Sequence, residues 1–306
     1  MREKTRDRLE AQFESYSIDD RLHDVPPHAV YEVTVEGRRA VAKLDTDRTG
    51  SAGMAGAVIG FVGARTSVPV PEVLARGNDY YVTAWHPEAP TPEADQVSTE
   101  EWARTAGRGM ATLHAETASH LDGYGQFEPA GSNAIETTGH DEWHAAAIEY
   151  VTEYRPTLER HGHGDIAQRA LDCLRAHPDA FAGTGTSVCC HGWVTPEHLA
   201  VRDGEPACLV DFEHAIGAPG EFDYWRTVLP TFGPEDDGTR AAFRRGYESV
   251  RPLPDGLATR RPWYVLLHLL YFFESLYVQD QHDPETTEQK AADLRTTVTE
   301  ILADCT

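Results

Sequence analysis

Hydrophobic and polar residues alternate along much of the first third of the chain. The stretch AVYEVTVEGRRAVAKLD, residues 29–45, places successive side chains on opposite faces around Glu36-Gly37, which predicts a β-hairpin. The stretch VPVPEVLARGNDYYVTAWHP, residues 68–87, predicts two further strands around a Gly-Asn-Asp turn. Two helices are expected in the same part of the chain, over residues 3–15 and over the apolar, glycine-rich residues 52–64.

The period of the pattern changes after an acidic, proline-rich stretch that begins at residue 87. Trp102, Ala106, Met110 and Leu113 lie on one face of a predicted helix over residues 99–118. Six more helices are expected over residues 141–158, 165–177, 221–229, 235–250, 262–279 and 284–303. Short strands are expected between the helices over residues 165–177 and 221–229. The sequence therefore predicts an α+β fold with two lobes: a small β-rich lobe, residues 1–86, and a larger helical lobe, residues 87–306, with a hinge near residues 86–92.

The segment from Cys189 to Arg226 contains the clearest functional pattern. Two apolar runs, residues 199–201 and 207–210, flank Asp203-Gly204, which is a favoured hairpin turn. This hairpin would bring the loop that begins at His191 close to Asp211 and Glu213. Two carboxylates spaced two residues apart in an extended segment point the same way. We therefore expect them to form a Mg²⁺ site whose other ligands are phosphate oxygens.

The charge balance of the chain is strongly acidic. Fifty acidic residues face 27 basic ones, so the formal net charge is -23, and only three residues are lysine: Lys4, Lys43 and Lys290. Such a charge argues against binding to nucleic acid or to an anionic membrane surface, because both would be repelled. We interpret it as the surface of a cytoplasmic protein from a salt-loving organism; an acidic cytosolic protein from an ordinary host is the alternative.

The cysteines and the N-terminus also favour a cytoplasmic location. The five cysteines, at 173, 189, 190, 208 and 305, are irregularly spaced and contain no CxxC pair, which predicts reduced thiols. The first 16 residues, MREKTRDRLEAQFESY, are too charged for a signal peptide. No apolar run approaches the length of a membrane span.

Four motifs, in order along the chain, resemble the aminoglycoside phosphotransferase and choline/ethanolamine kinase family. They are AVAKL, TSVPVPEVL, GRGMATLHAET, and the segment HGWVTPEH, residues 191–198, which is followed by DFE, residues 211–213. In that family the catalytic loop reads H-G-D-x-x-x-x-N and precedes a hairpin and a metal-binding D-x-[DE]. The resemblance implies a two-lobe protein-kinase-like fold. It also implies an ATP- and Mg²⁺-dependent transfer of phosphate to a hydroxyl of a small molecule, such as an amino alcohol or amino sugar.

The resemblance assigns a role to each matching position. Lys43 would pair with the α- and β-phosphates of ATP, and His191 would hold the backbone of the loop. Asp211 would bind the metal with help from Glu213. Asp223 would accept hydrogen bonds from loop amides, which is a structural role.

Several positions depart from the family pattern. Trp193 replaces the catalytic aspartate, and an indole cannot accept a proton from a hydroxyl. His198 replaces the metal-binding asparagine, although a neutral imidazole can still bind a metal. The glycine-rich phosphate loop is replaced by HDVPPHAV, and the helix glutamate that should pair with the lysine falls near Ala55. Either another residue acts as the base, with Glu197 as the first candidate and Glu213 and His214 as others, or the protein binds a nucleotide or metabolite without turnover.

Two further features have both a functional and an ordinary interpretation. The histidines at 191, 198 and 214, with Glu197 and Cys189-Cys190, suggest a zinc or iron hydrolase, but neither H-x-x-x-H nor CxxC is present. The predicted helix over residues 262–279 is apolar all round, which is typical of a core helix. It also contains Trp263 and Glu274, which together suggest a pocket for a cationic amine.

Overall fold

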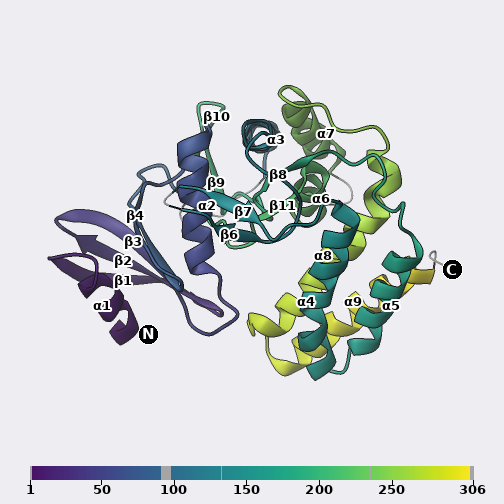
Figure 1. Cartoon of the computed structure of the whole chain (residues 1–306), viewed down its shortest axis with the longest axis horizontal. Helices are drawn as coiled ribbons and strands as arrows, with labels where there is room; N and C mark the ends of the chain where they lie inside the picture. Colours follow the sequence, from purple (N-terminus) through teal and green to yellow (C-terminus); the bar gives the residue numbers. More distant parts are fainter. Residues whose placement is uncertain (1, 91–97, 132, 234–235, 304–306) are drawn as a thin grey trace.

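The computed structural model describes residues 2–90, 98–131, 133–233 and 236–303. It is an α+β fold, as the sequence predicts, with a β-rich part formed by the first 84 residues and a helical part beyond it (Figure 1). The helices are α1 (Arg2–Glu10), α2 (Ala52–Arg65), α3 (Glu100–Thr117), α4 (Trp143–Arg160), α5 (Gly164–Ala176), α6 (Gly220–Thr231), α7 (Asp237–Glu248), α8 (Leu257–Val278) and α9 (Pro284–Ala303). The strands are β1 (Tyr16–Val25), β2 (His28–Val35), β3 (Arg38–Asp45), β4 (Val73–Arg76), β5 (Tyr80–Ala84), β6 (Phe127–Pro129), β7 (Ile135–Thr137), β8 (Ser187–Cys190), β9 (Leu199–Arg202), β10 (Glu205–Leu209) and β11 (Ile216–Pro219).

The N-terminal sheet has the strand order β1-β2-β3-β5-β4, and all neighbours are antiparallel. The predicted β2–β3 hairpin is confirmed: Glu36 and Gly37 both have positive φ, 50° and 76°, as a two-residue hairpin turn requires. The helix expected over residues 3–15 is too long, because α1 ends at Glu10 and β1 follows. β1 was missed because its burial alternates only weakly and its stability comes from pairing with β2.

Helix α2 lies between the sheet and the rest of the molecule (Figure 1). It packs closely on the sheet, since a Cβ on Gly56 would lie 2.5 Å from the Cβ of Tyr81 in β5. Ala55 beside it is fully buried, and α2 contains no acidic residue. The lysine of β3 therefore has no glutamate partner in this helix, as the sequence predicts.

The helical part contains three short antiparallel pairs, β6–β7, β8–β11 and β9–β10. The predicted hairpin around Asp203-Gly204 is confirmed as β9–β10. One hydrophobic core joins α2 to α3 and α7, and a second joins α4, α5, α8 and α9. The predicted boundary at residues 86–87 remains a prediction, and the end of the predicted hinge, residues 91–92, lies outside the described residues.

The cysteines correct one expectation. Cys189, Cys190 and Cys208 are buried free thiols, but Cys173 is disulfide-bonded, so the prediction of a reduced thiol is wrong there. Cys305 lies outside the described residues. Within the described ranges, every helix is too short or too polar to cross a membrane.

Candidate active site

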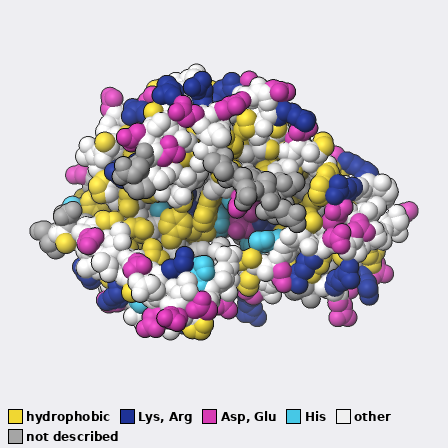
Figure 2. All heavy atoms as spheres, turned by 180° about the vertical axis from the view of Figure 1, so that it is seen from behind, with side chains coloured by type: hydrophobic (Ala, Val, Ile, Leu, Met, Phe, Trp, Pro, Cys, Tyr) yellow, Lys and Arg dark blue, Asp and Glu magenta, His cyan; other side chains and the backbone are white. Residues whose placement is uncertain are grey.

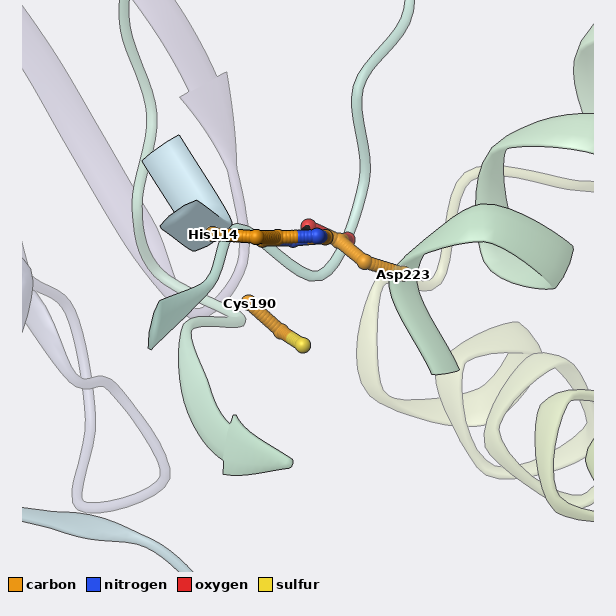
Figure 3. Close-up of side chains that lie close together, drawn as sticks. All are labelled: His114, Cys190 and Asp223. Atoms are coloured by element: carbon orange, nitrogen blue, oxygen red, sulfur yellow. Dashed lines mark hydrogen bonds and ion pairs between the residues drawn. The ribbon is translucent and has the colours of Figure 1, made fainter. Parts of the chain in front are cut away.

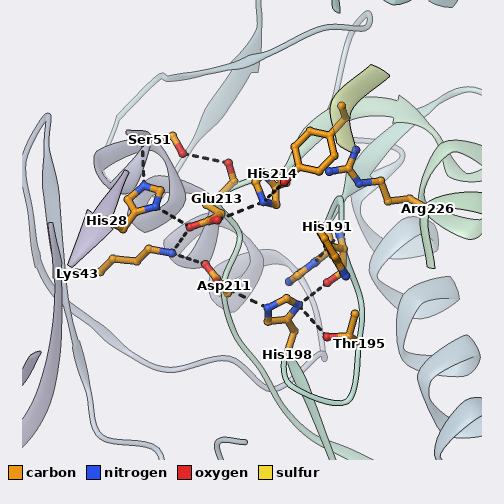
Figure 4. A network of polar contacts seen from close by, with 12 residues as sticks. His28, Lys43, Ser51, His191, Thr195, His198, Asp211, Glu213, His214 and Arg226 are labelled. Carbon is orange, nitrogen blue, oxygen red and sulfur yellow. Dashed lines mark hydrogen bonds and ion pairs between the residues drawn. The ribbon is translucent and has the colours of Figure 1, made fainter. Parts of the chain in front are cut away.

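Lys43, Asp211 and Glu213 meet where the sheet faces the helical part (Figure 4). Lys43 lies in β3 and is only 4% exposed, while its Nζ reaches across to Asp211 Oδ1 at 2.5 Å and forms an ion pair with Glu213. Burial opposes the charged form of Lys43, but the two carboxylates outweigh it and raise its pKa. Burial raises the pKa of each carboxyl, but Lys43 together with the neighbouring histidines outweighs this effect, so both pKa values are lowered. All three groups are therefore charged at neutral pH.

His28 completes this cluster, although it is not among the site residues that the sequence predicts. It begins β2, directly after the Pro26-Pro27 turn that stands in place of a glycine-rich loop. Its Nδ1 lies 2.9 Å from Glu213 Oε2. Burial lowers the pKa of His28, yet hydrogen bonds to Asp45 and Glu213 raise it above its ordinary value. We call Lys43, His28, Asp211 and Glu213 the carboxylate end of the site. No local pattern in HDVPPHAV predicts His28, because its contact with Glu213 depends on the folded chain.

The backbone around Asp211 differs from the extended segment that the sequence predicts. Asp211 has a φ of 68°, in the left-handed region, which is uncommon for a residue other than glycine. Phe212 turns into the core, where its ring lies 4.6 Å from the His191 ring. Because Phe212 is buried, Asp211 and Glu213 on either side of it still converge on Lys43.

The loop that starts at His191 is held by buried hydrogen bonds. Asp223, at the start of α6, accepts hydrogen bonds from the amides of His191 and Gly192, both at 2.8 Å. The His191 side chain lies 2.9 Å, through Nε2, from the carbonyl oxygen of Val210, and burial lowers its pKa to about 4. Gly192 has a φ of 87°, and a Cβ there would lie 2.2 Å from the carbonyl oxygen of His214. The loop is therefore fixed against the segment that follows Asp211.

His198 has the orientation of a metal ligand. Its Nδ1 lies 2.6 Å from the carbonyl oxygen of Trp193, so Nδ1 carries the hydrogen and donates to it. The lone pair of a neutral ring is then on Nε2, which lies 3.7 Å from Asp211 Oδ2. Two carboxylates and this nitrogen are donor types that divalent cations bind, although imidazole is a poorer partner than oxygen for Mg²⁺. Asp211, Glu213 and His198 would hold the ion.

Trp193 packs into an aromatic group next to the carboxylate end. Its ring centroid lies 6.0 Å from that of His214 and 5.9 and 5.4 Å from those of Tyr271 and Phe272 in α8. The guanidinium carbon of Arg226, in α6, lies 5.6 Å from the centre of the Trp193 ring. We call these five residues the loop end of the site. The family position of the catalytic aspartate is thus occupied by an aromatic surface.

His214 connects the two ends. Its Nε2 lies 2.9 Å from the Tyr271 hydroxyl and 3.2 Å from Glu213 Oε1. Burial lowers the pKa of His214, although Glu213 opposes this effect, so the ring is neutral at pH 7. It is a base next to the position that Trp193 has taken.

Three predicted residues lie apart from these two ends. Glu197 is exposed, and its side chain forms no ion pair or hydrogen bond with the residues that the structure describes. Glu274 accepts a hydrogen bond at 3.2 Å from Thr157 in α4, and burial raises its pKa. Trp263 lies against His177, with ring centroids 5.2 Å apart. Eleven residues separate Trp263 from Glu274, or roughly 16 Å along a helix, so they cannot enclose one amine.

A second cluster of metal-type ligands lies behind the loop (Figure 3). His114, Cys190 and Asp223 are all buried, but their polar atoms already have partners. His114 uses Nδ1 toward the Tyr247 hydroxyl and Nε2 toward Asp223. Asp223 also accepts the two loop amides described above. The cluster is therefore a structural support, and nothing in it favours the metallohydrolase alternative.

Comparison with known proteins identifies similar phosphotransferases and kinases. A model of the phosphotransferase enzyme family (APH) matches residues 28–263. A probable ketoamine kinase of Synechocystis sp. is 26% identical over 210 residues, which cover 68% of this chain and 66% of that protein, just under two thirds of its length.

Three solved structures show the same fold at low identity. Aminoglycoside phosphotransferase APH(4)-Ia superposes with a TM-score of 0.68 at 16% identity, covering 99% of both chains. A thermostable mutant of that enzyme, solved with ADP and hygromycin B, has a TM-score of 0.67 at 17% identity and covers 97% of both chains. A microcompartment-associated aminopropanol kinase has a TM-score of 0.61 at 14% identity, covering 99% of this chain and 98% of the other.

Proposed function

The chain belongs to the phosphotransferase enzyme family, and on that premise we propose that it transfers the γ-phosphoryl group of ATP to a hydroxyl of a small molecule, with Mg²⁺. The observation that carries the proposal is the meeting of Lys43 with Asp211 and Glu213 across the two parts of the chain. These residues are 168 and 170 positions from Lys43, so their contact depends on the complete fold.

The carboxylate end would bind the nucleotide. When ATP binds, Lys43 exchanges one or both carboxylates for phosphate oxygens, which its buried position favours because few waters compete. Asp211, Glu213 and His198 would hold Mg²⁺, which supplies charge neutralisation at the phosphates. In place of glycine amides, His28 would present an imidazole close to the phosphates.

The loop end would bind the acceptor. The bond from the γ-phosphorus to the bridging oxygen of ADP breaks, and a bond to the acceptor oxygen forms. His214 is our candidate to receive the hydroxyl proton, because it is neutral at pH 7 and adjoins both Glu213 and the Trp193 ring. Glu197 is less favoured, since it is exposed and its side chain forms no hydrogen bond or ion pair with the described residues.

One observation favours a second function. The Trp193 indole packs on Tyr271 and Phe272, at the position where the family aspartate would orient the hydroxyl. A protein with this arrangement could bind ATP without turnover. Phosphoryl transfer depends mainly on positioning and charge neutralisation, so loss of the base lowers the rate by about 10²–10⁴-fold and does not abolish it.

The two functions are separated by measuring binding and turnover on the same protein. Binding of ATP·Mg²⁺ should raise the melting temperature of the wild type, and Lys43→Ala should remove this rise. ATP consumption is then followed over a broad panel of hydroxylated small molecules in molar KCl. Turnover that falls by about 10²-fold in His214→Gln, and little in Glu197→Gln, supports the kinase. Nucleotide binding with no turnover across the panel supports the inactive alternative, and a melting temperature that ATP·Mg²⁺ does not change contradicts both.

A further inference from the structure

Arg226 is a buried cation without a counter-ion. Its side chain is 1% exposed, and no carboxylate of the described residues forms an ion pair with it. Nη1 donates one hydrogen bond, to the Tyr150 hydroxyl at 2.9 Å. Nε and Nη2 are buried and have no hydrogen-bond partner. A buried guanidinium with two unpaired nitrogens is unfavourable unless a ligand completes it.

The unpaired atoms of Arg226, Nε and Nη2, form one edge of the guanidinium. Other arginines of this protein bind carboxylates through the same edge. Arg260, which is 6% exposed, uses Nε and Nη2 to bind the buried carboxylate of Glu221. At the surface, Arg39 uses the same two atoms to bind Glu32, at 2.5 and 3.0 Å. This edge matches the two oxygens of a carboxylate, which it binds through two parallel hydrogen bonds. Arg226 differs from both in having the edge but no carboxylate.

The position of Arg226 connects it to the acceptor. Its guanidinium carbon lies 3.5 Å from the centre of the Tyr271 ring and 5.6 Å from the centres of the Trp193 and Phe272 rings. Figure 4 shows it beyond His214, on the side away from Lys43. A group bound to Arg226 would therefore lie near the hydroxyl that approaches His214.

Part of the aromatic group around Arg226 reaches the surface. Figure 2 shows a hollow in which hydrophobic side chains gather, extending toward histidine and acidic side chains near the middle of the molecule. Of the rings around Arg226, those of Trp193 and Phe272 are partly exposed. Because Arg226 is 1% exposed, a ligand can reach the guanidinium only if one of the surrounding rings moves.

We propose that Arg226 binds a carboxylate of the acceptor, so that the acceptor is a small hydroxylated carboxylic acid. The proposal rests on the phosphotransferase function and narrows its substrate class. It also replaces the expectation of a purely cationic amine, because Glu274 and Trp263 lie apart from each other and from Trp193. An acid with both a hydroxyl and an amino group remains within the class, since Arg226 selects only for the carboxylate.

Binding of matched pairs tests the proposal directly. Each pair has an acid and the corresponding alcohol: glycerate and glycerol, serine and ethanolamine, gluconate and sorbitol. Isothermal titration of the full chain, with and without ADP·Mg²⁺, should show at least one acid that binds about 10-fold or more tightly than its alcohol. Trp193 fluorescence should respond to that acid, and the response should be absent in Trp193→Phe.

Substitutions assign any preference to Arg226. Arg226→Gln should remove it, and Arg226→Lys should reduce it, since an ammonium cannot form the two parallel bonds. Arg261→Gln, at an exposed arginine of α8, should leave it unchanged. Circular dichroism checks that each variant is folded. If Arg226→Gln is not folded, the acid and alcohol affinities of the wild-type protein decide whether the acceptor site prefers a carboxylate.

Three results would overturn the proposal. They are no acid preferred over its alcohol, no acid bound at millimolar concentration, or a preference that persists in folded Arg226→Gln. If ATP·Mg²⁺ binds and is turned over while the acids show no preference, this inference fails and the phosphotransferase function stands. If the acids bind through Arg226 but ATP·Mg²⁺ does not bind, the proposed function fails and the carboxylate site stands.

Discussion

The carboxylate end and the loop end of the candidate active site differ in how their buried cations are paired. At the carboxylate end, Lys43 is matched by Asp211 and Glu213, and His28 adds a further contact to Glu213. At the loop end, Arg226 is surrounded by aromatic rings and has no carboxylate partner in the described part of the chain. The first end is electrostatically complete without ligand, so a ligand must displace existing pairs. The second end gains a missing partner when a ligand binds.

This difference has a consequence for where affinity and specificity originate. Exchange of Lys43 from carboxylates to phosphates replaces one set of ion pairs by another, so its net gain is small and depends on Mg²⁺. A carboxylate that reaches Arg226 satisfies two buried N–H groups that otherwise have no partner. The loop end is therefore expected to discriminate among acceptors, while the carboxylate end is expected to bind the common phosphate donor.

The largest effect is expected at Asp211. Asp211→Asn removes a charge from the proposed cation site and should lower phosphoryl transfer by about 10³-fold, comparable to loss of one strong electrostatic contact in an active site. The measurement is the rate of ADP formation at saturating ATP·Mg²⁺. Asp203→Asn, in the exposed turn of the β9–β10 hairpin, is the matched control, because it makes the same chemical change at another residue with positive φ. Equal rates for the two variants would remove Asp211 from the site.

Loss of Lys43 should destabilise the protein itself. Lys43→Met leaves Asp211 and Glu213 facing each other without a cation, which should lower the free energy of unfolding by about 3 kcal/mol. This value is at the lower end for a buried pair, because the Asp211 side chain is 31% exposed. Urea denaturation measures the change, and Lys290→Met in the exposed part of α9 should have no comparable effect. Added Mg²⁺ should recover part of the loss; a variant as stable as the wild type would show that the pairs contribute nothing.

His191, which anchors the loop, and the carboxylate end should also lose stability in different pH ranges. Burial lowers the pKa of His191 to about 4, so the unfolded chain takes up a proton there first as the pH falls. The contribution of His191, about 3 kcal/mol, is present above pH 6.5 and is lost between about pH 6.5 and 4. The pKa values of Asp211 and Glu213 are lowered, so their contribution is lost only below about pH 4.5.

Unfolding free energies from urea denaturation at a series of pH values distinguish these ranges. His191→Gln should flatten the dependence between about pH 6.5 and 4, while Asp211→Asn should leave that range unchanged. Other buried histidines with lowered pKa, His114 and His268, add to the slope in both proteins and do not affect the comparison. An identical slope for wild type and His191→Gln would contradict the assignment.

The smallest effect is expected for Trp193→Phe. A phenyl ring keeps most of the contact with Tyr271 and Phe272, so stability should change by about 1 kcal/mol or less, and turnover by only a few-fold. Trp193→Asp is the informative partner. It places a carboxylate at the family position of the base, close to Arg226, and should raise ATP consumption if the indole had suppressed it. A strong loss of turnover in Trp193→Phe would mean that the indole itself contacts the substrate.

The local elements and the order of the motifs follow from the residue pattern along the chain. Strand alternation and the Glu36-Gly37 turn predicted the β2–β3 hairpin, and the Asp203-Gly204 turn predicted β9–β10, because period and turn chemistry are local properties. Lys43, Asp211, Glu213 and His198 could be named because they stand at recognisable positions in those elements. The departure at Trp193 was equally visible, since it needs only the spacing from His191.

Which side chains meet depends on the folding of the complete chain. His28 reaches Glu213 across 185 positions of the sequence, and Arg226 is enclosed by rings from α4, from the loop and from α8. Glu274 and Trp263 belong to the same apolar helix but contact different residues, Thr157 and His177, because the rise of the helix separates them. The burial of a side chain and the lack of a hydrogen-bond partner depend on segments that are distant in the chain. No local sequence pattern encodes either property. For that reason the unpaired edge of Arg226 could be recognised only after the chain had folded.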